Sequence, residues 1–182
     1  LSLSLHAAAE WAEDPEKLEE AKAAVATGDI IVATMLFLEE HVTAIRPALE
    51  ARRGNCDALI GCVAATEIVK LTQIGDLDMA KPATGPMALL KRLRGKKTGS
   101  GSSGAGQMKM LRRLPKILRF IPGKAQDLRS YFLTMQYWLA GSDENVANMV
   151  RFLVGQYASG PRAGLRGRVT AADPVDYPDT GV

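Results

Sequence analysis

The chain has 182 residues, of which 47% are hydrophobic and 24% charged, and its formal net charge is +3. This globular composition predicts one domain, or slightly more, with a core that needs no crosslinks. Two cysteines exclude a disulfide-rich secreted scaffold, and no apolar stretch reaches the ~20 residues of a membrane-spanning helix. The N-terminus has no signal-peptide pattern. The chain begins without Met and ends abruptly, so we expect a piece of a larger protein.

The charge is unevenly distributed along the chain. Residues 81–126 contain twelve Lys and Arg and no Asp or Glu, so the remainder carries a net charge of −9. A split of this kind indicates an interface with an acidic partner or a neighbouring acidic surface.

The first third of the chain predicts alternating strands and helices. Residues 1–5 alternate Leu and Ser, which is typical of a half-buried strand. Asp14, followed by Pro15, predicts the start of a helix that ends near Gly28. Residues 30–37 form a continuous apolar run and predict a strand buried on both faces.

The alternation continues to residue 75. We predict a helix over 39–53, which Pro47 would bend, a buried strand over 58–63 and a short helix over 66–74 that ends at Gly75. This order predicts an α/β fold: a partial Rossmann-like or flavodoxin-like parallel sheet of about three strands, followed by a helical segment of three to four helices. The first strand of that sheet would lie upstream of the chain.

The remaining sequence is rich in helix signals. The predicted elements are a short basic helix over 87–93, a flexible Gly/Ser/Lys linker over 95–106, an amphipathic helix over 107–121, helices over 124–140 and 143–157, and a loop over 160–167. Gly141 would end the first of the last two helices and Ser142 would cap the second. The predicted domains are therefore 1–80 (α/β unit), 81–106 (basic helix and linker), 107–160 (helical segment) and 161–182 (linker into a further domain).

The linker matches a nucleotide-binding motif in sequence but lacks the structural context that the motif needs. Residues 99–104 read G-x-G-x-x-G, but a dinucleotide site needs a preceding strand and an acid about twenty residues later. No acid occurs before Asp127, and Ala105 stands where a Walker A motif requires Lys. A flexible linker is the better interpretation.

Two other groups of residues are of types that could bind a metal or act as a nucleophile. Glu39, Glu40 and His41 are metal-binding types, but no second His follows at helical spacing, so a solvated helix start is favoured. Cys56 and Cys62 could pair with His41 as a nucleophile, yet both lie in or beside an apolar run, which is typical of buried thiols. We assign no catalytic and no metal-binding residue.

For two sets of residues, both ligand binding and ordinary packing are possible interpretations. The segment 108–124 could bind nucleic acid or a membrane surface, although packing within a larger protein is favoured. An aromatic set could contact a flat tetrapyrrole, although those near Met135 have the helical spacing of a core. The set is Trp11, Tyr131, Phe132, Met135, Tyr137 and Trp138.

The amino-acid sequence of the chain resembles that of a known family. Residues 106–153, from GQMKMLRRLPKILRF to NMVRFL, resemble the large H subunit of magnesium chelatase in its bacteriochlorophyll-type form. The resemblance extends through GDIIVATMLFLEEHV (28–42), through 56–95 and into DPVDYPDTGV (173–182). The large subunit of cobaltochelatase is the nearest alternative and a poorer match.

This resemblance implies a function for the whole subunit. The family's large subunit binds protoporphyrin IX and, with an AAA+ ATPase subunit and that subunit's partner, inserts Mg²⁺ at the expense of ATP hydrolysed on those partners. This step leads to chlorophylls, in the bacterial cytoplasm or in the chloroplast stroma of plants and algae. The matched region is the N-terminal one, to which no porphyrin-binding residue can be transferred, so we expect a structural or gating role.

Two other functions remain open. One is a stand-alone module that binds a small ligand at the loops after Phe37 and Val63, where the carboxyl ends of predicted parallel strands meet. The other is a basic adaptor for a membrane surface or nucleic acid. Within the favoured interpretation we expect no nucleic acid as a partner, whereas peripheral membrane association stays open.

Overall fold

The computed structural model describes residues 2–82 and 124–175. Contacts divide the chain into two compact units. The N-terminal unit comprises residues 1–74 and 78–80, and the helical unit comprises residues 75–77 and 81–182. The domain boundaries expected at residues 80, 106 and 160 stay predictions.

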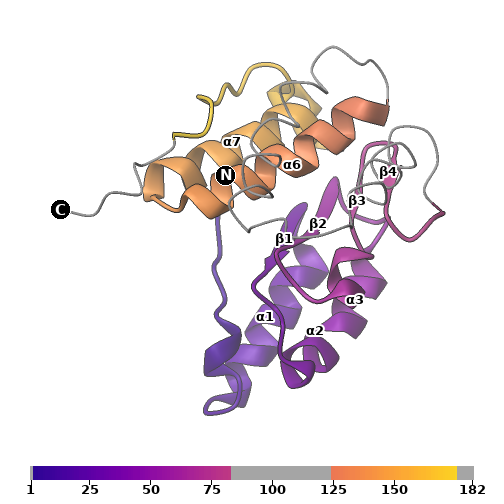
Figure 1. The fold of residues 1–182 in the computed structure, drawn as a ribbon, viewed down its shortest axis with the longest axis vertical. Helices are drawn as coiled ribbons and strands as arrows, with labels where there is room; N and C mark the ends of the chain where they lie inside the picture. Colours follow the sequence, from indigo (N-terminus) through magenta and orange to yellow (C-terminus); the bar gives the residue numbers. More distant parts are fainter. Residues whose placement is uncertain (1, 83–123, 176–182) are drawn as a thin grey trace, which may run out of the picture. The chain divides into compact units, whose positions relative to one another are not determined.

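The N-terminal unit is an α/β fold, which confirms the predicted class (Figure 1). Its four-stranded sheet has the order β1-β2-β3-β4. Strands β1 and β2 are parallel, with Ile30 opposite Ala58 and Thr34 opposite Cys62, whereas β2 and β3 are antiparallel. The elements are η1 (Ala8–Glu10), α1 (Pro15–Thr27), β1 (Ile30–Thr34), α2 (Glu39–Arg52), β2 (Ala58–Cys62), α3 (Thr66–Val69), β3 (Gln73–Ile74) and β4 (Leu77–Asp78).

Helix α1 begins and ends where the sequence predicts. The Asp14 carboxylate accepts a hydrogen bond from the Glu16 amide at 3.0 Å, and Pro15 occupies the first turn. The amide of Gly28 caps the other end on the carbonyl of Ala24. The Arg52 guanidinium at the end of α2 donates twice to the Gly28 carbonyl, at 3.1 and 3.0 Å, so α2 is joined to the end of α1.

The core of this unit lies where α1 and α2 meet one side of the sheet. It is made of buried apolar side chains from α1, β1, α2, β2, α3 and the segments next to these elements. They are Trp11, Ala21, Ala33, Leu36, Val42, Ile45, Leu49, Leu59, Ile68 and Leu71.

Two predicted strands differ from the observed structure. Residues 2–5 form no strand, and Leu3 and Leu5 are 61% and 77% exposed, because alternation alone supplies no pairing partner. The strand expected over 30–37 ends at Thr34, because Met35 adopts a φ of +58°, which leaves the extended conformation.

The helix predicted over 66–74 is also wrong in its second half. Helix α3 ends at Val69, and Gln73 and Ile74 instead pair with β2. Gly75, at a φ of +50°, then turns the chain into β4. The sheet is therefore mixed rather than purely parallel, because an antiparallel hairpin completes its edge.

One side chain extends the hydrogen bonding of β2 beyond its short pairing with β3. The Thr72 hydroxyl accepts from the Gly61 amide at 2.9 Å and donates to the Gly61 carbonyl at 3.1 Å. Thr72 is fully buried, so these two backbone groups have no access to water. A Cβ at position 61 would lie 2.2 Å from the Ile68 carbonyl oxygen, so only glycine permits this close approach of α3.

We predict that Thr72→Val lowers the free energy of unfolding by about 2–4 kcal/mol, because it removes the hydroxyl that makes two buried hydrogen bonds with the backbone of Gly61. Thr72→Ser keeps the hydroxyl and is the matched control, with an expected loss of about 1 kcal/mol for the missing methyl group. Chemical denaturation followed by circular dichroism measures both. Equal losses for the two variants would contradict the proposed role of the hydroxyl.

The helical unit contains the two helices predicted here. Helices α6 (Lys124–Ala140) and α7 (Asp143–Tyr157) lie side by side (Figure 1). Gly141, at a φ of +67°, ends α6, and the Ser142 hydroxyl accepts from the Asn145 amide at 3.3 Å. The loop expected over 160–167 is instead largely a 3-10 helix, η2 (Gly160–Leu165), because Pro161 favours a helical start.

Buried asparagines of α7 hold the segment that follows η2. The Asn145 side chain donates to the Val175 carbonyl at 3.1 Å and accepts from the Val175 amide at 2.9 Å. Asn148 accepts from the Ala172 amide at 3.3 Å, and the Tyr137 hydroxyl of α6 donates to the Ala172 carbonyl at 2.5 Å. Residues 172–175 thus pair with side chains much as a strand pairs with a neighbour.

The aromatic set of α6 divides between core and partly exposed positions. Tyr131 and Tyr137 are buried, as a core interpretation predicts. Phe132, Met135 and Trp138 are half-buried. Burial also raises the pKa of Tyr137 above its usual value, so its hydroxyl stays a hydrogen-bond donor in the physiological range.

Asp127 joins three parts of the helical unit. Its carboxylate accepts from the Asp76 amide at 2.8 Å and from the Tyr157 hydroxyl at 2.9 Å. A Cβ on Gly75 would lie 2.4 Å from a carboxylate oxygen of Asp127. Burial raises the pKa of Tyr157 well above its usual value, and a hydrogen bond with Ser130 opposes this shift only in part. The carboxylate therefore meets a permanent O–H donor.

We predict that Asp127→Ala lowers the free energy of unfolding of the chain by about 2–3 kcal/mol, because two donors lose a charged acceptor. Tyr157→Phe removes one of these bonds, and a double-mutant cycle should give a coupling energy of about 1–2 kcal/mol. Glu144→Ala, an exposed acid on α7, is the control and should cost no more than about 0.5 kcal/mol. Additive losses at Asp127 and Tyr157 would contradict the pairing.

Several predicted features lie outside the described residues. They are the basic helix over 87–93, the linker over 95–106 with its glycine motif, and the amphipathic helix over 107–121. Among the helices that are described, none combines the length and the apolar character needed to cross a bilayer.

Candidate binding groove

Two loops meet at the carboxyl ends of the parallel strands. Residues 35–38 connect β1 to α2, and residues 63–65 connect β2 to α3. The Met35 amide donates to the Val63 carbonyl at 2.9 Å, and the Ala65 amide donates to the Leu36 carbonyl at 2.8 Å. Ligands of open α/β sheets usually bind at this edge, so these joined loops are the first place to look for a site.

Both loops contain a residue in a strained conformation. Met35 has a φ of +58° and Val63 a φ of +47°. The left-handed region is unfavourable for side chains with a Cβ, and especially for a β-branched residue such as valine. Such residues cost about 1–3 kcal/mol each and gather at binding and catalytic sites. The strain therefore marks this edge as a candidate functional site.

A groove of about 550 Å³ opens beside these loops. Six of its nine lining residues lie on one face of α2, at positions that recur every three or four residues. The lining residues are Phe37, Glu39, Val42, Thr43, Arg46, Pro47, Glu50, Ala65 and Glu67.

The groove carries more negative than positive charge. Arg46 donates to Glu50 at 2.6 Å, so that pair is neutral. Glu39 and Glu67 form no ion pair with any other residue that the structure describes. The groove is therefore suited to a cationic group.

The three residues of metal-binding type at the start of α2 do not come together as one site. Glu39 lines the groove, whereas the His41 ring packs edge-on against Trp11 with ring centroids 5.7 Å apart. Glu40 approaches His41 at 3.8 Å. Over residues 2–82 and 124–175, no three His, Cys, Asp or Glu side chains come together as a metal site would require.

The cysteines differ in burial. Cys62, at the end of β2, is buried, and burial raises the pKa of its thiol to about 11, opposed by the Thr34 hydroxyl. Cys56 is half-buried, and burial raises its pKa as well, opposed by Arg52. A nucleophilic cysteine requires the opposite shift, so neither thiol has the character of a catalytic group.

We predict that Cys62 reacts with a thiol reagent at pH 8 at least about 100-fold more slowly in the folded chain than in urea, because its thiolate fraction falls by about that factor. The measurement uses Cys56→Ser, in which Cys62 is the remaining cysteine. In the matched variant Cys62→Ser, the half-buried Cys56 should react faster. Comparable rates for the two variants would contradict the burial argument.

The sequence pointed to part of this groove, and ligand binding there stays a prediction. It placed a ligand site at the loops after Phe37 and Val63, and the groove contains Phe37 and begins beside the second loop. It missed the contribution of α2 through Thr43, Arg46 and Glu50. The available signal was weak, because a polar face on a helix is also what ordinary solvation produces.

Comparison with known proteins decides the family. A family described as "Domain of unknown function (DUF3479)" matches residues 1–132. The chain belongs to this family. It is also 56% identical over 182 residues to the magnesium-chelatase H subunit of Cereibacter sphaeroides and 57% identical to that of Rhodobacter capsulatus, in each case over 100% of this chain.

A more distant relative shows the same relationship. The chloroplastic ChlH subunit of magnesium chelatase from Oryza sativa subsp. indica is 29% identical over 171 residues, which are 93% of this chain. The chain spans about 15% of the length of the two bacterial relatives and about 12% of that of the rice protein. The bacterial matches lie in the N-terminal region of the H subunit, as the resemblance found in the sequence implied.

Proposed function

We propose that this chain is an N-terminal part of the large subunit of a magnesium chelatase and acts as a structural and gating element for it. In this proposal the whole subunit binds protoporphyrin IX, and Mg²⁺ is inserted with ATP hydrolysed on an AAA+ ATPase subunit and its partner, in the cytoplasm or the stroma. The identity of 56–57% over the full chain to the H subunits of two bacterial magnesium chelatases is the observation that carries it.

The described residues support a role in contacts rather than in chemistry. The groove presents carboxylates, exposed apolar side chains and an open helix face, which are features of a recognition surface. Its lining includes no Cys, His or Ser that could act as a nucleophile or proton shuttle. Contact with the remainder of the subunit, or with a partner subunit, makes use of such a surface.

A second candidate function is favoured by one observation. The groove lies at the carboxyl ends of β1 and β2, and its volume of about 550 Å³ falls within the range of small-molecule sites. A small ligand bound there would make the chain a binding module in its own right.

We predict that removing residues 1–182 from the full-length subunit leaves protoporphyrin binding within about two-fold of the intact subunit but lowers the chelation rate by about ten-fold, which is a typical coupling between sites. Porphyrin binding is followed by fluorescence quenching, and chelation by the appearance of magnesium protoporphyrin. The ATPase rate of the partner subunits is measured in parallel. Retained porphyrin binding also shows that the truncated subunit is folded.

Two outcomes would overturn the gating role. Unchanged chelation with unchanged ATPase coupling would show that the region is dispensable. Tight protoporphyrin binding by the isolated chain, seen as quenching of Trp11 and Trp138, would place the porphyrin site in this region and make its role substrate binding. Returning the chain in trans to the truncated subunit is the matched control and should restore part of the lost rate.

A further inference from the structure

We infer that the groove beside α2 is a docking surface for a basic amphipathic helix of a partner protein. The inference rests on the proposed function only in placing the chain within a larger assembly. The observations that carry it are the open face of α2, a set of exposed apolar side chains beside it, and an unbalanced negative charge on the surrounding unit.

The face of α2 in the groove is a regular helical stripe. Glu39, Thr43, Arg46 and Glu50 are spaced by four, three and four residues, so they form one row along the helix. Helix α2 has 14 residues, which corresponds to a length of roughly 20 Å. Val42 and Pro47 line the groove between these polar positions. A second helix of three to four turns has the right shape to lie along such a row.

The loop at one end of the stripe supplies apolar anchors. Met35, Phe37 and Leu38 are 57%, 56% and 56% exposed, whereas Leu36 between them points into the core. Three large apolar side chains exposed in four consecutive residues are costly in water and are typical of a contact site. Phe37 itself lines the groove, so an apolar edge lies beside the α2 face.

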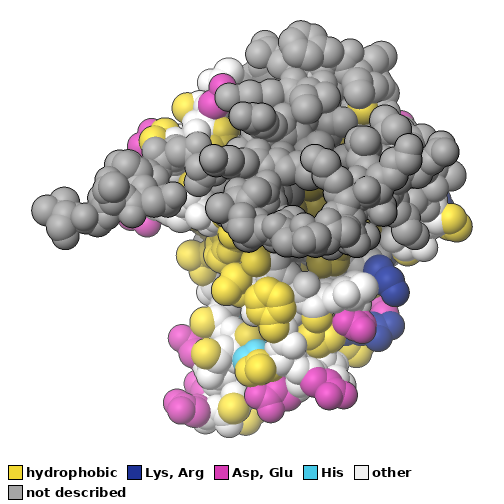
Figure 2. Space-filling model, in the orientation of Figure 1, with side chains coloured by type: hydrophobic (Ala, Val, Ile, Leu, Met, Phe, Trp, Pro, Cys, Tyr) yellow, Lys and Arg dark blue, Asp and Glu magenta, His cyan; other side chains and the backbone are white. Residues whose placement is uncertain are grey.

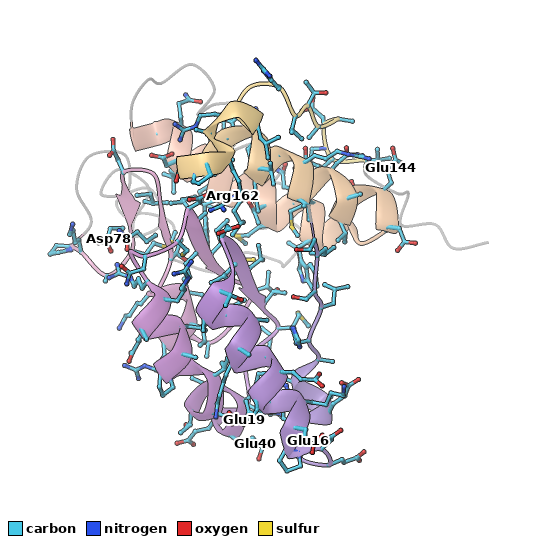
Figure 3. All side chains as sticks on the ribbon, turned by 180° about the vertical axis from the view of Figure 1, so that it is seen from behind. Glu16, Glu19, Glu40, Asp78, Glu144 and Arg162 are labelled. Carbon is cyan, nitrogen blue, oxygen red and sulfur yellow. The ribbon has the colours of Figure 1, made fainter. Side chains whose placement is uncertain are left out.

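The charge identifies the partner as basic. The N-terminal unit contains thirteen Asp and Glu but only six Lys and Arg, a net charge of −7. Figure 2 shows acidic side chains interspersed with hydrophobic ones on this unit, and Figure 3 labels Glu16, Glu19 and Glu40 at one end of it. In the groove itself, Glu39 and Glu67 have no cationic partner among the described residues. Lys or Arg on an incoming helix would supply one.

Shape distinguishes a helix from a compact ligand. The groove is partly open to solvent rather than enclosed, and six of its nine lining residues belong to one helix, α2. Enclosed, largely apolar cavities hold small molecules by burying most of their surface. An open acidic row with an apolar edge instead fits an amphipathic helix, whose Leu side chains contact Phe37 and whose Lys side chains contact Glu39 and Glu67.

The test uses the 182-residue chain and a synthetic peptide about as long as α2, built from Leu and Lys in helical periodicity. Binding is followed by fluorescence anisotropy of the labelled peptide. We expect saturable binding, weakened about ten-fold by Glu39→Lys with Glu67→Lys and about five- to ten-fold by Phe37→Ala. A peptide with Glu in place of Lys should not bind.

Glu13→Lys with Glu16→Lys is the matched control. It makes the same change in net charge, and Glu16, like Glu39, belongs to the first turn of a helix, but neither residue lines the groove. We expect this control to weaken binding by less than about two-fold. Phe37 is more than half exposed, so Phe37→Ala should leave the denaturation midpoint nearly unchanged, which separates loss of binding from loss of fold.

Three outcomes would overturn the inference. The first is that the peptide does not bind, which includes the case in which the basic residues of 81–126 already occupy the groove. The second is that the control pair weakens binding as much as the groove pair, which would indicate a general charge effect. The third is that Phe37→Ala has no effect on binding, which would show that Phe37 is not an apolar anchor. None of these results bears on whether deletion of the region slows chelation, so the proposed function is tested separately.

Discussion

The N-terminal unit depends on one close approach, that of α3 to β2 at Gly61. A side chain at this position would overlap the Ile68 carbonyl, so the absence of a Cβ is what lets a helix of a single turn pack directly on the strand. The same approach brings the Thr72 hydroxyl within reach of both backbone groups of Gly61. The turn that carries Ala65 and Glu67 into the groove is therefore fixed by a backbone contact in the core.

The groove edge is held in a conformation that local preferences oppose. Met35 and Val63 occupy the left-handed region, and the hydrogen bond between them keeps the two loops together. One consequence is that Leu36 enters the core while Met35 and Phe37 face solvent. Strain and exposed apolar surface both disfavour the folded chain when it is alone, so their coincidence at one edge is best explained by a contact that compensates for them.

The sequence predicted the elements whose signals are local. Asp14 and Pro15 set the start of α1, and Ser142 set that of α7. The apolar run at 58–63 predicted a buried strand, which the structure has over Ala58–Cys62. It failed where a distant partner decides. Residues 73–74 leave the predicted helix because β2 offers an edge to pair with, and residues 2–5 find no such edge. The sequence did not predict the groove face of α2, because only its position beside exposed Phe37 distinguishes it from an ordinary solvated helix face.

Charge and shape make different contributions to recognition by this chain. The N-terminal unit carries −7 and residues 81–126 carry +12, so the sign of the charge changes along the chain, whose net charge is +3. Long-range attraction between such charges is screened by salt and discriminates poorly among basic partners. Selectivity must therefore come from contacts at short range, above all from Phe37 and from the spacing of Glu39 and Glu67 on two different helices. Electrostatics then governs how fast a partner arrives, and the apolar edge governs which partner stays.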